Sequence, residues 1–248
     1  MLPGDDIVSA TGMPYDTLQD IIGWGEGDAP VGSLREMGVS FHPVALRGGK
    51  IDLDAVENAI TPKTKLVIAQ RSRGYDWRPS LMPEEFAPLA KMLHEKHPGV
   101  RLMVDNCYGE FVCEKEPSHY GADVCVGSLI KNPGGGLAPT GGYIVGTQEA
   151  VERIAYRLTA PGIGQEVGSY AASYQPFYQG LFMAPHTVAQ AIKTACLAAR
   201  VFEILGMTTT PAADEPRADI IQAIQMRTPE RLVAFCPVSY THLTLPTI

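Results

Sequence analysis

The sequence predicts an α/β fold whose sheet is mostly parallel. Short apolar segments rich in Val and Ile recur between Asp6 and Val145, segments with helical periodicity separate them, and polar clusters follow most of the apolar segments. The chain has 248 residues, of which 45% are hydrophobic and 19% are charged, so it can bury the core of one or two domains. No internal repeat or low-complexity segment interrupts the pattern.

The apolar segments predict the strands. The last strand follows three consecutive glycines that allow a sharp return of the chain, so we expect it to run antiparallel to its neighbour. Strands are expected near Asp6–Ala10, Ser40–Leu46, Lys65–Gln70, Arg101–Asp105, Asp123–Gly127 and Gly142–Val145.

Helical periodicity predicts the intervening elements. Helices are expected over Tyr15–Ile22, Leu53–Ile60 and Pro83–His94, and Asp52 and Met82–Pro83 mark the starts of the last two. A later helix is expected to bury an apolar stripe at helical spacing: Val188, Ile192, Ala195, Ala199, Phe202 and Leu205.

Composition argues against several classes of partner and site. The net charge of −7 and the pI near 5.4 give no basic surface for a polyanion, so we expect no nucleic-acid partner. No apolar run approaches the roughly 20 residues that span a bilayer, and no basic segment followed by an apolar one opens the chain, so we expect a cytoplasmic protein without membrane contact. The five cysteines include no C-x-x-C pair and the six histidines are scattered, so we expect neither a disulfide framework nor a metal site.

Polar residues follow the apolar segments where a ligand of an open parallel sheet would lie, beyond the carboxyl ends of the strands. Four clusters stand there: T-G-M-P-Y-D, Q-R-S-R-G-Y, D-N-C-Y-G-E-F and G-S-L-I-K-N-P-G-G-G. If the strands are parallel, one rim of the sheet carries Tyr15, Gln70, Arg71, Asp105, Tyr108, Ser128 and Lys131.

Lys131 does not belong to a nucleotide site, because a P-loop lysine follows its glycines whereas Lys131 precedes them. A strand-end aspartate followed by S-x-x-K after the next strand suits pyridoxal phosphate. The cofactor's aldehyde needs an amine, which Lys131 would supply, and its pyridine nitrogen needs a carboxylate to stay protonated, which Asp105 would supply.

Other rim residues would complete this cofactor site. Tyr108 is placed to hydrogen-bond the ring hydroxyl, Ser128 to donate to the phosphate, and Tyr15 to stack on the ring, while Gln70 stands where cofactor or substrate contacts are expected. The glycine run would let the backbone approach the cofactor closely. Structural alternatives are that the tyrosines pack in the core, that Ser128 and Asp105 cap turns, and that Arg71 and Arg73 pair with acidic side chains.

These residues carry a resemblance to fold-type I pyridoxal-phosphate enzymes and, within them, to the aluminium-resistance or methionine gamma-lyase-like family related to cystathionine lyases. The resemblance covers roughly residues 1–236. It implies carbon-sulfur lyase chemistry on an amino acid and a homo-oligomer with active sites at subunit interfaces. The motifs that carry it are P-G-D-D-I-V-S-A-T-G-M-P-Y-D-T-L, V-D-N-C-Y-G-E-F, G-S-L-I-K-N-P-G-G-G-L-A-P-T-G-G-Y-I-V-G, and T-A-P-G-I-G-Q-E followed by Y-Q-G-L-F-M-A-P-H.

The resemblance also predicts the domain organisation: residues 1–206 form the large cofactor-binding domain and residues 207–237 begin a small C-terminal domain. The fold normally places a phosphate-binding helix before P-G-D, so we expect the chain as given to bind the cofactor poorly. Residues 238–248 are expected to be an artefact, because V-S-Y-T-H-L-T-L-P-T translates GTC TCT TAT ACA CAT CTG ACG CTG CCG ACG, which resembles a transposase adapter. Periodicity alone would make T-H-L-T-L a strand.

The predicted reaction is an elimination in which Lys131 moves a proton from the substrate α-carbon and a sulfur group leaves from the β or γ position. The sequence does not choose between the two positions. An aminotransferase of the same fold and a cofactor-free structural or oligomerisation protein remain as alternatives.

Overall fold

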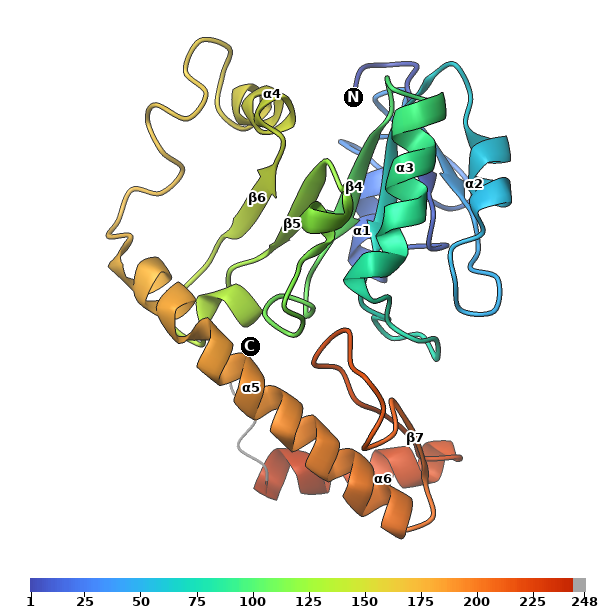
Figure 1. Cartoon of the computed structure of the whole chain (residues 1–248), viewed down its shortest axis with the longest axis vertical. Helices are drawn as coiled ribbons and strands as arrows, with labels where there is room; N and C mark the ends of the chain where they lie inside the picture. Colours follow the sequence, from blue (N-terminus) through green and yellow to red (C-terminus); the bar gives the residue numbers. More distant parts are fainter. Residues whose placement is uncertain (243–248) are drawn as a thin grey trace.

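The computed structural model describes residues 1–242, with side chains described through Cys236, and its centre is a six-stranded sheet (Figure 1). The order across the sheet is β2-β1-β3-β4-β5-β6; the first five strands are parallel, and β6 runs antiparallel to β5. This confirms the predicted fold class. The strands are β1 Asp6–Ser9, β2 Ser40–Pro43, β3 Thr64–Gln70, β4 Arg101–Asp105, β5 Val124–Ser128 and β6 Gly142–Gly146.

The strand expected over Ser40–Leu46 is shorter than predicted. Its partner β1 ends at Ser9, which lies opposite Pro43, so no strand remains beyond that point for β2 to pair with. The other strands lie within two residues of their expected bounds.

The three predicted helices are present. They are α1 Asp16–Ile22, α2 Leu53–Ala59 and α3 Ala87–Lys96. Asp52 begins α2 as expected, because its Oδ1 accepts a hydrogen bond from the Ala55 N–H at 3.1 Å. The segment that opens at Pro83 begins differently: its first turn is a 3₁₀ helix, η1 Pro83–Phe86, and the α-helix follows it.

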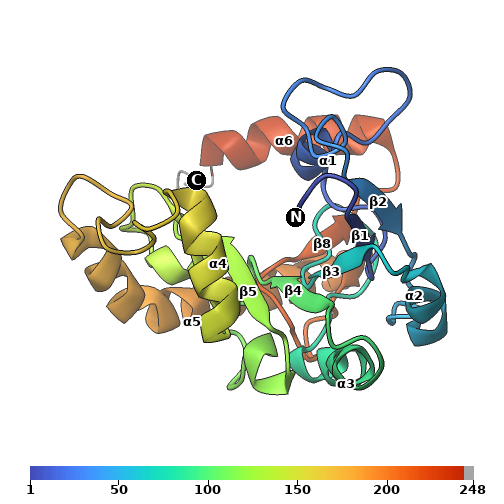
Figure 2. The ribbon, with the colours of Figure 1, turned by 90° about the horizontal axis from the view of Figure 1, so that it is seen from above.

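The core lies mainly on one face of the sheet. Alternate residues of β3 and β4, such as Val67 and Leu102, are buried under η1 and α3, where Phe86 and Leu93 are fully covered. Seen from above, α3 lies on one side of the sheet and α1 on the other (Figure 2). The intervening strand residues, Gln70 among them, are only half-buried, so the second face is less completely covered.

After the sheet come α4 Gln148–Leu158 and a long helix, α5 Gln175–Ile204, which runs away from the sheet (Figure 1). Of the predicted apolar stripe, Val188, Ala195 and Ala199 are buried, as expected. Leu205 is not part of the core: it follows the end of α5 and is 65% exposed, so its inclusion was wrong. Helical spacing cannot show where a helix stops.

The C-terminal part contains an antiparallel pair, β7 Thr208–Thr210 and β8 Ala223–Gln225, and the helix α6 Pro229–His242. The boundaries expected at residues 206 and 237 stay predictions. So does the adapter origin of residues 238–248: the backbone is helical through His242, and residues 243–248 lie outside the described part of the chain.

The described residues were also compared with the requirements of a membrane-spanning helix and of a metal site. None of the helices in the described residues combines the length and the apolar character that crossing a membrane requires. Within the same residues, no three or more His, Cys, Asp or Glu side chains gather as metal ligands would.

Candidate active site

A cavity of about 240 Å3 opens where β3 and β4 end. Gln70 and Asp105 are the last residues of these strands and lie opposite each other in the parallel register. The structure brings five of the predicted residues together in the cavity wall, because Tyr15, Tyr108 and Lys131 join them there. The wall is completed by Asp16, Thr17, Ser72, Gly74, Tyr75, Cys107 and Ile221.

Two larger cavities do not carry this combination. One of about 490 Å3 adjoins the first and shares Tyr15 and Gln70 with it, and another of about 560 Å3 has Trp24 and Phe41 among its lining residues. Neither of these two cavities is lined by Lys131 or Asp105. The smallest of the three is therefore the candidate active site.

Lys131 lies where β5 has ended, immediately before the short 3₁₀ turn η3 Asn132–Gly134. Its Nζ is 4.1 Å from the centre of the Tyr108 ring, a cation–π contact. Burial lowers the pKa of the Lys131 amine, but the interactions with Cys107 and Tyr108 outweigh burial and leave the pKa above its ordinary value. Without a bound ligand, Lys131 is therefore an ammonium group at neutral pH.

Asp105 ends β4 with its carboxylate at the cavity. Its Oδ1 accepts a hydrogen bond from the Cys107 N–H at 3.0 Å, which closes a tight turn and orients the side chain. Burial, followed by the charge of Asp105, raises the pKa of the Cys107 thiol to about 12, so the thiol is neutral. Among the described residues, no Lys, Arg or His forms an ion pair with Asp105, which leaves the carboxylate free to bind a cationic group.

Tyr15 and Gln70 connect the β1–α1 loop to the end of β3. The Tyr15 N–H donates to Gln70 Oε1 at 3.4 Å, and Gln70 Nε2 donates to the Ser72 carbonyl oxygen at 3.0 Å. The Tyr15 side chain is 40% exposed, so one side of its ring is free for a ligand. Burial, followed by the charge of Asp105, raises the pKa of Tyr15 and keeps the phenol protonated.

Tyr108 adopts a left-handed backbone conformation, with φ at 70°. Its carbonyl oxygen accepts a hydrogen bond from the Ile220 N–H at 3.1 Å, which brings the C-terminal segment to the cavity, where Ile221 forms part of the wall. No local pattern in the sequence predicts this contact, because more than a hundred residues separate the two segments.

Ser128 stands apart from the other predicted residues. It is the last residue of β5, pairs with Gly142 of β6, and accepts a hydrogen bond from the Lys131 N–H through its carbonyl oxygen at 3.3 Å. Within the described structure it is not among the residues that line the cavity. Its role as a phosphate ligand stays a prediction.

The glycine run packs against α5. A Cβ atom on Gly134 would lie 1.8 Å from the Leu129 carbonyl oxygen, and one on Gly135 would lie 2.3 Å from the Gly180 carbonyl oxygen. Conversely, a Cβ on Gly180 would lie 2.2 Å from the Gly134 carbonyl oxygen. The close approach that these glycines permit is thus to the backbone of α5.

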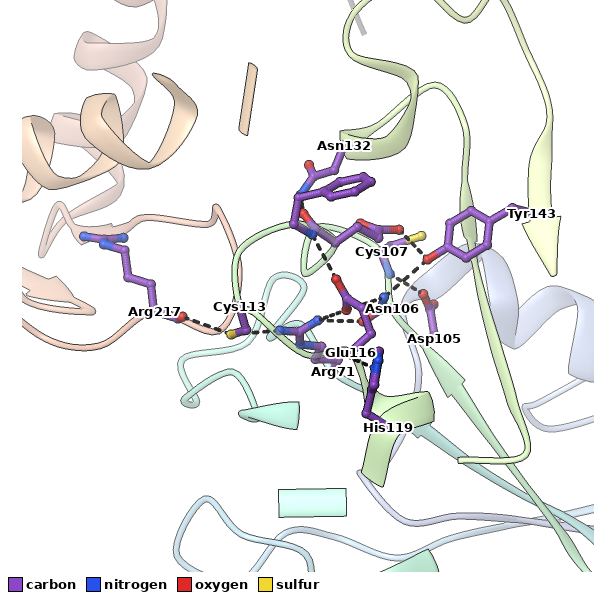
Figure 3. A network of polar contacts seen from close by, with 12 residues as sticks. Arg71, Asp105, Asn106, Cys107, Cys113, Glu116, His119, Asn132, Tyr143 and Arg217 are labelled. Atoms are coloured by element: carbon purple, nitrogen blue, oxygen red, sulfur yellow. Dashed lines mark hydrogen bonds and ion pairs between the residues drawn. The ribbon is translucent and has the colours of Figure 1, made fainter. Parts of the chain in front are cut away.

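Arg71 follows Gln70 at the end of β3, where its N–H donates to the Asp105 carbonyl oxygen at 3.0 Å, but its side chain does not line the cavity. It is fully buried, and its Nη1 donates to Asn106 Oδ1 at 2.7 Å and to Glu116 Oε2 at 2.8 Å (Figure 3). Its Nη2 donates to Cys113 Sγ at 3.3 Å. The alternative that Arg71 pairs with an acidic residue is therefore confirmed: its backbone lies at the strand end as predicted, while its side chain is buried against Glu116.

Arg73 is also buried, and its Nη1 donates to the Thr210 carbonyl oxygen at 3.0 Å. It ties the end of β3 to β7, an interaction between distant segments for which the sequence offers no local sign.

Glu110 belongs to the motif D-N-C-Y-G-E-F, and no role was predicted for it. It is the one ionisable residue of this motif that is nearly completely buried. It is 4% exposed, and its Oε1 accepts a hydrogen bond from the Tyr143 hydroxyl at 2.8 Å. Figure 3 shows Tyr143 reaching this segment from β6, with Asn106 close to the same hydroxyl at 3.3 Å. The only signal in the sequence was an acidic residue inside this strand-end motif.

The chain is similar in sequence to an uncharacterized bacterial protein and, over a shorter stretch, to an L-methionine gamma-lyase. YnbB, an uncharacterized protein of Bacillus subtilis (strain 168), is 48% identical over 235 residues, which are 94% of this chain and 56% of that protein. The L-methionine gamma-lyase of Porphyromonas gingivalis is 32% identical over 102 residues, 41% of this chain and 24% of the enzyme.

Among solved structures, a carbon-sulfur lyase involved in aluminium resistance from Clostridium novyi NT superimposes with a TM-score of 0.89 at 43% identity. The superposition covers 95% of this chain and 56% of that one, so this chain spans little more than half the length of these relatives. The model of the methionine gamma-lyase family matches residues 1–242, and the chain therefore belongs to the methionine gamma-lyase family.

Proposed function

We propose that the protein is a pyridoxal-phosphate-dependent carbon-sulfur lyase that acts on a sulfur-containing amino acid. The observation that carries the proposal is the shared cavity of Lys131 and Asp105, an amine and an unpaired carboxylate at the end of a parallel sheet. Members of the matching family are pyridoxal-phosphate enzymes, and the Clostridium novyi relative is described as a carbon-sulfur lyase.

The residues present fit this cofactor. Lys131 would hold its aldehyde carbon, Asp105 would face its pyridine nitrogen, and the rings of Tyr15 and Tyr108 supply aromatic walls. Ser128 is proposed to contact the phosphate. When bound, pyridoxal phosphate supplies an electron sink that stabilises negative charge at the substrate α-carbon.

The chain's own residues would then manage protons and orientation. Once released from the cofactor, the Lys131 amine lies in the cavity and can take the proton from the substrate α-carbon. Asp105, oriented by the Cys107 N–H, would keep the pyridine nitrogen protonated. For a β-substituted substrate, the balanced reaction consumes one water and yields a thiol, a 2-oxo acid and ammonium.

The test has two measurements. Borohydride reduction of the protein with pyridoxal phosphate, followed by peptide mass mapping, should place the pyridoxyl group on Lys131; finding it on Lys65 or Lys193 would refute the assignment. Incubation with cystathionine or methionine should release a thiol and a 2-oxo acid in equal amounts. Amino-group transfer without thiol release would identify an aminotransferase instead.

We also propose that the protein assembles as a homo-oligomer. The support is the resemblance, together with apolar side chains that α5 leaves exposed, such as Phe182 at 83% and Ile204 at 78%. Sedimentation velocity at two protein concentrations would test this, and a monomer at both would contradict it.

A further inference from the structure

A buried hydrogen bond joins the lysine loop to the segment that carries Asp105. Asn132 follows Lys131 directly and is 6% exposed, and its Nδ2 donates to the Glu110 carbonyl oxygen at 3.0 Å (Figure 3). Glu110 belongs to the same short segment as Asp105 and Tyr108. This hydrogen bond therefore connects the residue that follows Lys131 to the segment that carries Asp105 and Tyr108.

The side chain of Glu110 is fixed in turn by β6. Tyr143, whose hydroxyl donates to Glu110 Oε1 at 2.8 Å, lies opposite Gly127 in the antiparallel pairing of β5 and β6. A Cβ atom on Gly127 would lie 2.5 Å from Glu110 Oε1 and 2.4 Å from Tyr143 Cε1. Strand β5 thus has room for this pair only because residue 127 is glycine.

Glu110 releases its proton near neutral pH. Burial, with smaller contributions from the charges of Glu116 and Asp105, raises the pKa of Glu110 to about 7. Its Oε2 is buried and has no hydrogen-bond partner among the described residues, so the side chain is held through Oε1 alone. The Glu110–Tyr143 contact therefore relies on the shape of the side chain and on one acceptor oxygen.

We propose that Asn132 and Glu110 are positioning residues for Lys131: Tyr143 fixes Glu110, the Glu110 carbonyl oxygen fixes Asn132, and Asn132 holds the Lys131 amine over the Tyr108 ring and beside Asp105. Neither residue lines the cavity, so neither touches a substrate there. The proposal rests on the proposed function for its catalytic consequence. The geometric part concerns the chain alone.

The geometric part can be measured without cofactor. Reductive methylation with ¹³C-formaldehyde labels lysine amines, and the ring current of Tyr108 at 4.1 Å should give the Lys131 methyl signal a distinct chemical shift. In Asn132→Ala and Glu110→Ala this shift should collapse to the value of exposed lysines such as Lys193. In Glu110→Gln it should persist, because glutamine keeps the side-chain acceptor for Tyr143 that alanine removes, while the main-chain carbonyl that Asn132 bonds is present in every variant.

Matched controls separate positioning from general loss of stability. Glu203 on α5 also accepts two hydrogen bonds, from Thr209 Oγ1 at 2.9 Å and from the Ala213 N–H at 2.8 Å, and it lies outside the cavity wall. Glu203→Ala should leave the Lys131 signal unchanged. If Glu110→Ala fails to fold, Asn132→Ala, which removes a single hydrogen bond, still decides the question.

The catalytic part follows from kinetics with cystathionine as substrate. Displacing an amine by about 1 Å costs on the order of 10²-fold in rate, so Asn132→Ala should lower kcat by about that factor while KM changes less than about threefold. Glu110→Gln should keep kcat within about threefold. A wild-type Lys131 signal in Asn132→Ala and Glu110→Ala would overturn the positioning role. Loss of the signal in a protein that shows no lyase activity at all would refute the proposed function and leave the positioning role supported.

Discussion

Polar residues lie on both sides of the segment Asp105–Phe111. The two sides differ in how many ion pairs and hydrogen bonds their charged side chains form within the protein. On the cavity side, Lys131 and Asp105 have no ion-pair partner among the described residues. On the other side, both Nη atoms of the buried Arg71 are hydrogen-bonded, and Glu116 accepts from several donors. Paired groups hold a backbone in place, whereas unpaired ones at a cavity remain available to a ligand.

The difference predicts how mutations divide between activity and stability. Changes on the cavity side should reduce activity and leave the fold intact, because no ion pair is lost there and the contacts of Lys131 with Tyr108 and of Asp105 with the Cys107 N–H are few. Changes on the paired side should first lower the free energy of unfolding. A cavity mutation that unfolds the protein, or a network mutation that changes neither property, would contradict this division.

The largest effect is expected from Lys131→Ala. It removes both the covalent attachment of the cofactor and the group that moves the α-proton, so turnover should fall by about 10³-fold or more. The thermal midpoint should stay within about 2 °C of wild type. Lys193→Ala on the exposed surface of α5 is the control, and equal turnover losses in the two variants would contradict the assigned role.

Asp105→Asn should follow. Asparagine keeps the shape and can still accept from the Cys107 N–H, but it lacks the negative charge that keeps a pyridine nitrogen protonated. Turnover should fall by about 10²- to 10³-fold while far-ultraviolet circular dichroism stays unchanged. Near wild-type turnover in the folded variant would exclude the charge role.

The paired side should respond to pH through Glu110. Its pKa of about 7 in the folded protein lies above the ordinary value of 4.5, so between these pH values the folded state holds a proton that the unfolded chain has released. Stability should therefore fall as pH rises from about 4.5 to 7 and then level off, by at most on the order of 3 kcal/mol. The charges that face Glu110 are Glu116 and Asp105, and both favour the protonated form.

Denaturant unfolding from pH 4.5 to 8 would measure this slope. Glu110→Gln cannot ionise, so its profile should be flatter over the same interval, and Glu203→Gln should keep the wild-type slope. Identical slopes in wild type and Glu110→Gln would show that Glu110 is ionised throughout.

The steric match at Gly127 predicts the next effect. Gly127→Ala would place a methyl group against Glu110 and Tyr143 and should lower the free energy of unfolding by about 2 kcal/mol, as overpacking does. Gly99→Ala is a matched control, because a Cβ there meets nothing within 4 Å, and it should stay within about 0.5 kcal/mol of wild type. Equal stabilities of the two variants would show that β5 tolerates a side chain at position 127.

The sequence predicted the parts of this molecule that depend on local patterns. Strand alternation, the Asp52 cap and the strand-end positions of Gln70 and Asp105 arise from neighbouring residues. What could not be predicted depends on contacts between distant segments: the burial of Arg71 against Glu116, the approach of Ile220 to Tyr108, and the packing of Gly134 on α5. Leu205 shows the same limit, since its exposure follows from where α5 ends.

The smallest effect tests whether Tyr143 contributes more than packing. Tyr143→Phe keeps the ring between β5 and Glu110 but removes the hydroxyl that donates to Oε1 at 2.8 Å, so the free energy of unfolding should fall by about 1 kcal/mol. Tyr174→Phe is the control, because the Tyr174 hydroxyl accepts from the Ser169 and Tyr170 N–H groups at 3.2 and 3.0 Å in an exposed loop, where water can replace it. Its cost should be smaller than that of Tyr143→Phe. The loss at Tyr143 should be larger above pH 8 than at pH 6, because the hydroxyl stabilises the ionised Glu110 carboxylate and holds the Glu110 pKa below the value that burial alone would give. Urea unfolding of both variants at pH 6 and 8.5 would measure this difference, and a loss at Tyr143 that shrinks at high pH would contradict the role of the hydroxyl as a donor to the ionised Glu110 carboxylate.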